Sequence, residues 1–271
     1  MESWEAFILG IVQGLTEFLP VSSSGHLLLS KEILGIENNG GTTFEVLVHA
    51  ATVLSTLTVF RNDIVKLFAG LFKFNYNQET EYILKIAVSM IPVMIVGLFF
   101  KEEVEALFGE GPALVGAMLL LTAILLLFSH LARKIERRTE RKTEKPISYA
   151  NAFVIGIAQA CAVLPGLSRS GSTISTGLLL GNNRNEIARF SFLMVLVPIL
   201  GEAFLDLIHG NFSPTASGIA VFPLIIGFIG AYVSGLFACK LMIKLVSQVK
   251  LYWFAIYCAV IGTAAIVYSL I

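Results

Sequence analysis

Long apolar runs, separated by short polar segments, follow one another along most of this chain of 271 residues. Most of the runs approach or reach the ~20 residues that a helix needs to cross the hydrocarbon core of a bilayer. They are continuous and do not alternate between apolar and polar positions, which argues against a transmembrane β-barrel. The pattern predicts an all-α polytopic membrane protein with about six transmembrane helices, at 43–60, 83–100, 112–131, 188–208, 219–239 and 251–271.

The composition agrees with this prediction, since 56% of the residues are hydrophobic, 14% are charged, and the mean hydropathy is +0.80. The net charge of zero gives no indication of a nucleic-acid partner, and we expect none. Cys161, Cys239 and Cys258 lie in apolar surroundings without metal-ligand spacing, so we expect small core residues. Pro92 and Pro198 are expected to kink their helices.

Charge in the loops predicts the orientation of the chain in the membrane. The segment 133–146 carries seven Lys and Arg residues, which is typical of a cytoplasmic loop. Counting the predicted helices from this loop places the N- and C-termini outside, together with the net acidic segment 101–111. Residues 1–20 lack a basic region and a cleavage site, so no removable signal is expected.

The chain contains an internal repeat with a fixed offset of 146 residues. The sequence "WEAFILGIVQGLTEFLPVSSSGH" at 4–26 matches "ANAFVIGIAQACAVLPGLSRSGS" at 150–172, and Phe44 still pairs with Phe190. Three predicted helices separate the two copies, an odd number, so the copies have opposite orientations. We therefore predict a single membrane domain built as an inverted-topology repeat. Its two halves are 1–131 and 147–271, and the loop 132–146 joins them.

Each copy is predicted to form two short helices around a polar turn. The expected bounds are 4–18 and 23–35 in the first copy, and 148–163 and 170–180 in the second. A helix of 15 residues covers roughly 22 Å, which is too short to cross a core of ~30 Å. We therefore predict two re-entrant hairpins whose tips meet near mid-membrane, where irregular backbone must be buried or line a cavity.

The two tips differ at the positions that carry charge. Arg169 stands in the second tip where the first has Ser23, while Glu17 and His26 of the first tip have no titratable counterpart. An arginine inside a membrane costs at least ~2.5–3.5 kcal/mol and therefore needs a partner. The partner is either Glu17, in an internal salt bridge, or a phosphate or carboxylate that fits the guanidinium fork.

Hydroxyl groups and free backbone N–H groups at the start of the second tip's helix favour phosphate over carboxylate. The first tip also carries hydroxyls, and those of Ser22 and Ser24 can equally serve as N-cap and turn residues. The predicted phosphate-binding residues are Ser22, Ser24, Ser168, Arg169, Ser170 and Thr173.

Gln13 and Glu17 are spaced i, i+4, so both side chains lie on one face of the first short helix. Their hard oxygen atoms suit Mg²⁺ or Ca²⁺, with phosphate oxygens completing the coordination shell. The alternative is a polar stripe that packs against the other copy. A second i, i+4 pair, Glu45 and His49, either lines the cavity or forms its own hydrogen bond.

His26 follows Ser22 by four residues and Ser23 by three, so on a helix that starts near Ser22 it faces back toward both. A histidine beside a serine can act as a general base, and the Glu17 carboxylate can orient it. The alternative is a core histidine with satisfied hydrogen bonds. We predict Ser23 as the nucleophile, and Ser23, His26, Glu17 and Arg169 as the catalytic residues.

These groups together are what phosphoryl transfer needs, because that reaction depends on positioning and on neutralising charge. A cavity inside a membrane implies a substrate with a lipid tail, so the sequence predicts a lipid phosphate or pyrophosphate hydrolase. The alternative is a secondary transporter or flippase for an anionic polyprenyl-phosphate lipid, since inverted repeats with broken helices are typical of transporters. A transporter needs binding groups but no Ser–His pair.

The motifs "QGLTEFLPVSSSGH" (13–26) and "PGLSRSGST" (165–173) resemble the two signatures of the bacterial undecaprenyl-pyrophosphate phosphatase family, also called bacitracin-resistance proteins. The resemblance covers essentially the whole chain. It implies hydrolysis of undecaprenyl pyrophosphate to undecaprenyl phosphate and phosphate, which recycles the lipid carrier for peptidoglycan and protects against bacitracin. It also implies dependence on a divalent cation, and a plasma-membrane enzyme whose site opens to the outer side.

Carried onto this chain, the family resemblance implies a set of functional residues that agrees with the residues chosen above. One position departs from the pattern, because residue 13 is Gln where some members have Glu, and an amide adds no charge to a metal site. The sequence leaves open whether the protein forms a homodimer. The implied residues are Gln13, Glu17, Ser22, Ser23, His26, Ser168, Arg169, Ser170 and Thr173.

Overall fold

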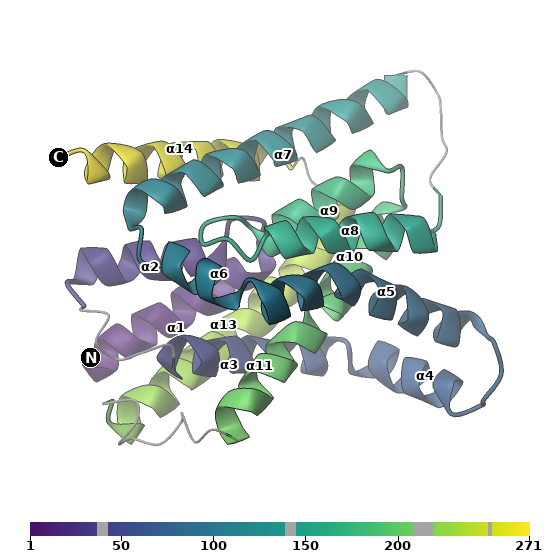
Figure 1. Ribbon diagram of the computed structural model, residues 1–271, viewed down its shortest axis with the longest axis horizontal. Coiled ribbons are helices and arrows are strands. Elements are labelled where there is room, and N and C mark those ends of the chain that lie inside the picture. The colour runs from purple at the N-terminus through teal and green to yellow at the C-terminus, as the bar shows by residue number, and fades with distance from the viewer. Residues whose placement is uncertain (37–42, 139–144, 209–218, 249–250) are drawn as a thin grey trace.

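The computed structural model describes residues 1–36, 43–138, 145–208, 219–248 and 251–271, and these residues form helices joined by turns (Figure 1). In the described ranges the one β-type pairing is an isolated bridge between Lys145 and Asn182. The helices are α1 (Ser3–Phe18), α2 (Ser23–Leu34), α3 (Thr43–Val59), α4 (Arg61–Leu71), α5 (Gln78–Phe99), α6 (Lys101–Leu107), α7 (Pro112–Arg138), α8 (Tyr149–Cys161), α9 (Arg169–Leu179), α10 (Arg184–Met194), α11 (Leu196–Ile208), α13 (Val221–Gln248) and α14 (Tyr252–Ser269).

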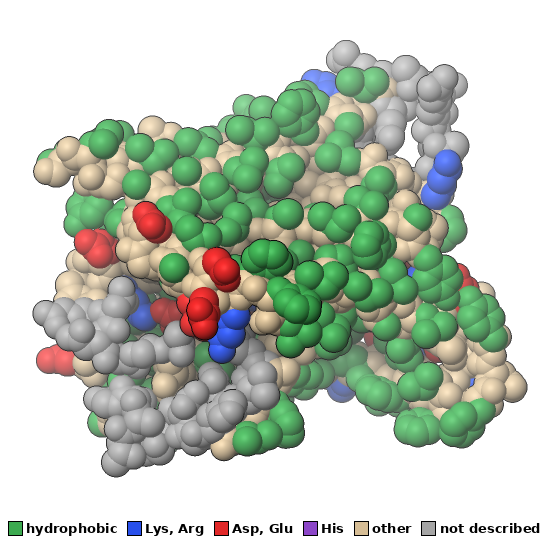
Figure 2. Space-filling model, in the orientation of Figure 1, with side chains coloured by type: hydrophobic (Ala, Val, Ile, Leu, Met, Phe, Trp, Pro, Cys, Tyr) green, Lys and Arg blue, Asp and Glu red, His purple; other side chains and the backbone are tan. Residues whose placement is uncertain are grey.

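Four helices of the described residues, α5, α7, α13 and α14, are long and apolar enough to cross a membrane. A fifth candidate consists of α3 and α4 together, which are bent by 75° at a short break. Few residues of α5 are buried, and Figure 2 shows apolar side chains over the exposed faces of α5 and of α7, as expected of helices that face lipid. The all-helical membrane fold is therefore confirmed.

The prediction of about six uninterrupted spans was wrong in one place. The predicted helix 188–208 is divided at Val195 into α10 and α11. Pro198 lies in the first turn of α11, where its missing N–H, which could otherwise donate to the Met194 carbonyl, costs no intrahelical hydrogen bond, so a new helix starts here more favourably than the earlier one continues. Pro92 lies inside α5, which continues through it.

The four short helices have the predicted bounds within a few residues, because a serine caps the second helix of each pair. Ser22 is the N-cap of α2, and its Oγ accepts a hydrogen bond from the Gly25 N–H at 3.3 Å. Ser168 is the N-cap of α9, and its Oγ accepts from the Gly171 N–H at 3.0 Å. The repeated serine thus starts a helix at the same point in both halves.

Each pair of short helices packs against a long helix from the other half of the chain. α1 packs along α13, and α8 packs along α5, while α7 and α14 pack against each other (Figure 1). Glycines allow this close approach: a β-carbon at Gly10 would collide with the Gly227 carbonyl, and one at Gly156 with the Ser89 carbonyl. Gly10 and Gly156 occupy equivalent positions of the repeat. This packing brings the two polar turns together.

We expect Gly10→Ala and Gly156→Ala each to lower the melting temperature of the purified protein in detergent. The added methyl group must separate two backbones, and overpacking of this kind costs about 1–3 kcal/mol. Gly97→Ala is the matched control, because nothing lies within 4 Å of a β-carbon there and alanine favours a helix by about 1 kcal/mol. If Gly10→Ala stabilised the protein as Gly97→Ala does, close packing of α1 on α13 would be refuted.

The two chain termini lie at the same end of the molecule, and α7 ends at the opposite end, where the basic segment 133–146 begins (Figure 1). Acidic side chains gather over α6, nearer the end with the termini (Figure 2). Residues 139–144 of the predicted basic loop lie outside the described residues. Cys239 and Cys258 are buried as predicted, but Cys161 is exposed, because it is the last residue of α8 and points away from the core.

Candidate active site

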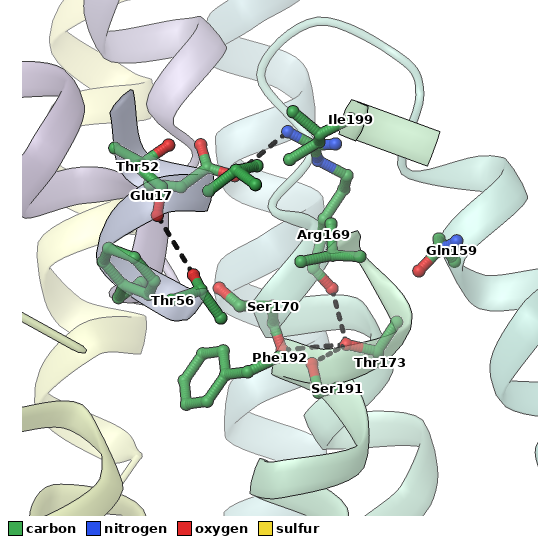
Figure 3. Close-up of a pocket in the computed structure, with 13 residues that line it drawn as sticks. Glu17, Thr52, Thr56, Gln159, Arg169, Ser170, Thr173, Ser191, Phe192 and Ile199 are labelled. Carbon is green, nitrogen blue, oxygen red and sulfur yellow. Dashed lines mark hydrogen bonds and ion pairs between the residues drawn. The ribbon is translucent and has the colours of Figure 1, made fainter. Parts of the chain in front are cut away.

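Glu17 is the centre of a polar cluster between the two tips. Its Oε1 accepts a hydrogen bond from Nη2 of Arg169 at 3.1 Å, and its Oε2 accepts from the Ser23 hydroxyl at 2.5 Å and from Nε2 of Gln13 at 2.9 Å. The Glu17 side chain is only 8% exposed, and Arg169 points toward it across the cavity (Figure 3). The internal salt bridge that the sequence offered as one partner for Arg169 is therefore present.

The tips also contact each other directly, as the sequence predicted. The Ser170 hydroxyl of the second tip donates to the Leu19 carbonyl of the first tip at 3.1 Å. Arg169 and Ser170 are the first residues of α9, while Glu17 and Leu19 stand where α1 ends. The structure thus brings the end of one helix onto the start of another, 152 residues later in the chain.

A narrow cavity of about 20 Å³ lies between the tips, which is room for about one water molecule. Glu17, Arg169, Ser170 and Thr173 line it, as predicted, together with residues of α3 and α10 (Figure 3). The other predicted residues are not among its lining residues. A cavity of this volume is too small for a diphosphate headgroup.

The three consecutive serines have different partners in the structure. Ser22 has an unusual backbone, with φ of 69°, and its hydroxyl caps α2. The Ser24 hydroxyl lies 3.4 Å from that of Ser22. Ser23 alone of the three donates to a carboxylate. This separates the two cap and turn serines from the serine that faces the charged cluster.

His26 lies in a different setting from the one predicted. Its Nδ1 is 2.7 Å from the Ser22 carbonyl oxygen, and its Nε2 is 2.8 Å from the Tyr257 hydroxyl. The Glu17 carboxylate contacts Ser23 and not His26. The expected imidazole between serine and carboxylate is therefore not the arrangement of this structure, because the turn at Ser22 presents its carbonyl to the ring. A catalytic role for His26 stays a prediction.

Two residues predicted to bind phosphate are already engaged within the protein. The Thr173 hydroxyl lies 2.6 Å from that of Ser191 and donates to the Arg169 carbonyl at 2.8 Å. The Ser168 hydroxyl caps α9 and lies 3.3 Å from the Ser170 hydroxyl. These contacts hold the start of α9 in place. Their roles in phosphate binding stay predictions.

The residues present fit a divalent cation at the predicted position. Oε1 of Gln13 is buried and has no hydrogen-bond partner, although its Nε2 donates to Glu17. An unpaired buried carbonyl oxygen beside a carboxylate is the donor set that Mg²⁺ or Ca²⁺ takes. Among the described residues no group of three or more His, Cys, Asp and Glu side chains lies together. A cation here would thus need oxygens from the substrate.

A family model described as bacitracin resistance protein BacA matches residues 6–264, nearly the whole chain. The chain belongs to the BacA family. The match contains both tips and every predicted site residue, from Gln13 to Thr173. The resemblance found in the two motifs is therefore confirmed.

Three relatives of the chain carry the name undecaprenyl-diphosphatase. The chain is 56% identical over 272 residues to the undecaprenyl-diphosphatase of Bacteroides fragilis, with 99% of each chain covered. It is 54% identical over 273 residues to the undecaprenyl-diphosphatase of Parabacteroides distasonis, again with 99% of each covered. A protein of the same name from Carboxydothermus hydrogenoformans is 38% identical over 270 residues, which cover 98% of this chain and 97% of that protein.

One residue that contacts the cluster in this BacA family member, His49, was not included among the predicted site residues. His49, on α3, has its Nε2 3.6 Å from Oε2 of Glu17, and its Nδ1 lies 2.7 Å from the Glu45 carbonyl oxygen. The Glu45 side chain instead pairs with Lys31 at 2.6 Å. The spacing of Glu45 and His49 pointed to this helix face, but the contact with Glu17 depends on how α3 packs on α1.

Proposed function

We propose that this chain hydrolyses undecaprenyl pyrophosphate to undecaprenyl phosphate and inorganic phosphate in the plasma membrane. This reaction recycles the lipid carrier for peptidoglycan synthesis and confers resistance to bacitracin. Membership of the BacA family and the shared name of the relatives support the proposal. The observation that carries it is the Ser23 hydroxyl bound to Glu17, whose carboxylate also contacts Arg169 from the other half.

The geometry suggests how these residues divide the work. Ser23 is the nucleophile, and Glu17 accepts its proton across the 2.5 Å hydrogen bond as the oxygen attacks the terminal phosphorus. The P–O bond of the anhydride breaks and undecaprenyl phosphate leaves; water then hydrolyses the phosphoserine, which releases phosphate and returns the proton to the Ser23 oxygen. The headgroup draws the Arg169 guanidinium away from Glu17, because two phosphates offer more charge and a better fit to its fork than one carboxylate. Arg169 and the backbone N–H groups at the start of α9 then stabilise the charge that develops on the phosphoryl oxygens.

A divalent cation, Mg²⁺ or Ca²⁺, belongs to this proposal. Oε1 of Gln13 and the Glu17 carboxylate would hold it, and it would neutralise charge on the diphosphate. The support is the buried, unpaired Gln13 oxygen beside Glu17. Gln13 otherwise orients Glu17 through its amide N–H.

The membrane arrangement is also part of the proposal: an inverted-topology repeat with two re-entrant hairpins, one from each side. Three observations support it. Ser22 and Ser168, at equivalent positions of the repeat, are both helix N-caps, and α1 and α8 each pack on a long helix of the other half, α13 and α5. Both termini also lie at one end of the molecule (Figure 1). With the basic segment 133–146 in the cytoplasm, the termini face outward, and the proposal places the entrance of the site on the same side. Assembly as a homodimer stays a prediction without a structural observation behind it.

Phosphate release from a C55 or shorter prenyl pyrophosphate by the purified protein in detergent tests the function directly. We expect release with Mg²⁺ or Ca²⁺ present and a loss of most activity with a chelator, because the diphosphate charge is then left without its counter-ion. An absence of release at any cation concentration, with binding of the lipid retained, would favour the alternative of a transporter or flippase.

A further inference from the structure

His26 is held at both of its ring nitrogens. Nδ1 lies 2.7 Å from the Ser22 carbonyl oxygen, and since a carbonyl only accepts, Nδ1 carries a proton and donates. In the neutral ring Nε2 is then the accepting nitrogen, and the Tyr257 hydroxyl, 2.8 Å away, donates to it. The two contacts select one tautomer of the imidazole.

The Tyr257 ring also fixes the plane of the imidazole. The two rings are stacked, with centroids 5.5 Å apart and planes inclined by only 10°. Tyr257 belongs to α14, and the neighbouring Cys258 donates its S–H to the Pro20 carbonyl of the first tip at 3.5 Å. The last helix of the chain is therefore anchored to the first tip at two adjacent residues.

We propose that Tyr257 is a positioning residue for His26: it holds the imidazole in the Nδ1–H tautomer and covers Nε2 until a diphosphate headgroup binds. A charged phosphate oxygen is a stronger acceptor than a neutral imidazole, so the headgroup takes the phenol hydroxyl and leaves Nε2 facing the substrate. Ser23 meanwhile keeps its own partner, Glu17. The covering of Nε2 is a property of the free protein, and only the effect on turnover rests on the proposed function.

Tyr257→Phe removes the hydroxyl and keeps the stacked ring, so it distinguishes the effect of the hydrogen bond from that of stacking. Diethyl pyrocarbonate acylates the unprotonated imidazole nitrogen, and mass spectrometry of peptides from the full-length protein in detergent gives the rate at each histidine. We expect the rate at His26 to rise about fivefold, the size of one lost hydrogen bond, while the rates at His49 and His130 stay constant. Tyr252→Phe is the matched control, because Tyr252 lies on α14 like Tyr257, and its ring lies 6.0 Å from that of His130 on α7.

Kinetics and a spectrum of the unaltered protein complete the test. In Tyr257→Phe we expect KM to rise about fivefold with kcat nearly unchanged, since the headgroup loses the phenol hydroxyl as a hydrogen-bond donor while Nε2 of His26 faces the substrate in either protein. In the native protein with ¹⁵N-labelled histidine, His26 should appear as the Nδ1–H tautomer. An Nε2–H tautomer, or an unchanged His26 acylation rate in a folded Tyr257→Phe, would overturn the proposal. If the native protein releases no phosphate, the proposed function fails, while the acylation result still decides the role of Tyr257.

Discussion

An Arg169→Ala variant is expected to lose turnover almost completely, with kcat/KM lowered about a thousandfold or more. The substitution removes the guanidinium that contacts Glu17 and that the diphosphate needs as a fork of donors. One positioned donor to a developing oxyanion is worth about 10²–10³ in kcat, and truncating one partner of a buried charge pair costs about 2–5 kcal/mol. Both losses occur together here. The helical fold should persist, because Glu17 keeps its hydrogen bonds from Gln13 and Ser23.

Phosphate release by purified variants, with circular dichroism and thermal melting as checks of the fold, measures this effect. Arg169→Lys should retain a small part of the activity, since lysine keeps the charge but not the planar fork. Arg189→Ala is the matched control: Arg189 is 57% exposed and pairs with Asp63 at 3.6 Å, and such pairs contribute about 0–1 kcal/mol. Near-native activity of Arg169→Ala would exclude the Arg169 guanidinium from the proposed mechanism.

The pair of Glu17 and Arg169 was predictable from the sequence because the repeat exposes it. Where the copies agree they share turns and caps, so the helix starts at Ser22 and Ser168 followed from two serines at one offset. Where the copies differ, one carries a carboxylate and the other a guanidinium. An arginine inside a membrane needs a partner, and the sequence offered either Glu17 or a phosphate or carboxylate ligand, so this contact was one of two expectations.

The surroundings of His26 were not predictable in the same way. Helix periodicity correctly placed His26 beside Ser22, but the ring contacts the Ser22 carbonyl, which also accepts from the His26 N–H, and the Ser22 hydroxyl caps α2 instead. Nothing in a serine-rich turn indicates which serine takes a positive φ. For another reason Tyr257 was missed, and His49 was named without Glu17 as its partner: these two residues lie on α14 and α3, and tertiary packing alone brings those helices to the tips.

The break at Val195 shows that a long apolar run does not always form one continuous transmembrane helix. The run 188–208 is apolar enough for a single transmembrane helix, yet it also supplies Ser191 to the cavity and must turn beside it. Pro198 makes that turn inexpensive, since its missing N–H falls in the first turn of α11, where no intrahelical partner is needed. Hydropathy alone predicted one helix for this run, whereas the structure divides it into α10 and α11 beside the cavity.

Among the three serine variants of the first tip, Ser23→Ala is expected to be the most damaging, with kcat lowered at least about a thousandfold. Ser23 donates to Glu17 at 2.5 Å, so a base is already in hydrogen-bond contact with its hydroxyl. Ser22→Ala removes an N-cap, which costs about 0.5–2 kcal/mol of stability, and should lower kcat far less because its hydroxyl faces α2. Ser24→Ala should also be mild, since its contact is with Ser22.

Single-turnover phosphate release with each variant distinguishes loss of the nucleophile from loss of stability. Ser30→Ala is the control, because Ser30 lies on α2 seven residues beyond Ser23 and outside the polar cluster. A large loss confined to Ser23→Ala, with melting temperatures of Ser23→Ala and Ser30→Ala alike, identifies the attacking oxygen. Equal and modest losses in Ser22→Ala and Ser23→Ala would instead point to attack by water or by His26, with Glu17 activating water in place of a serine hydroxyl.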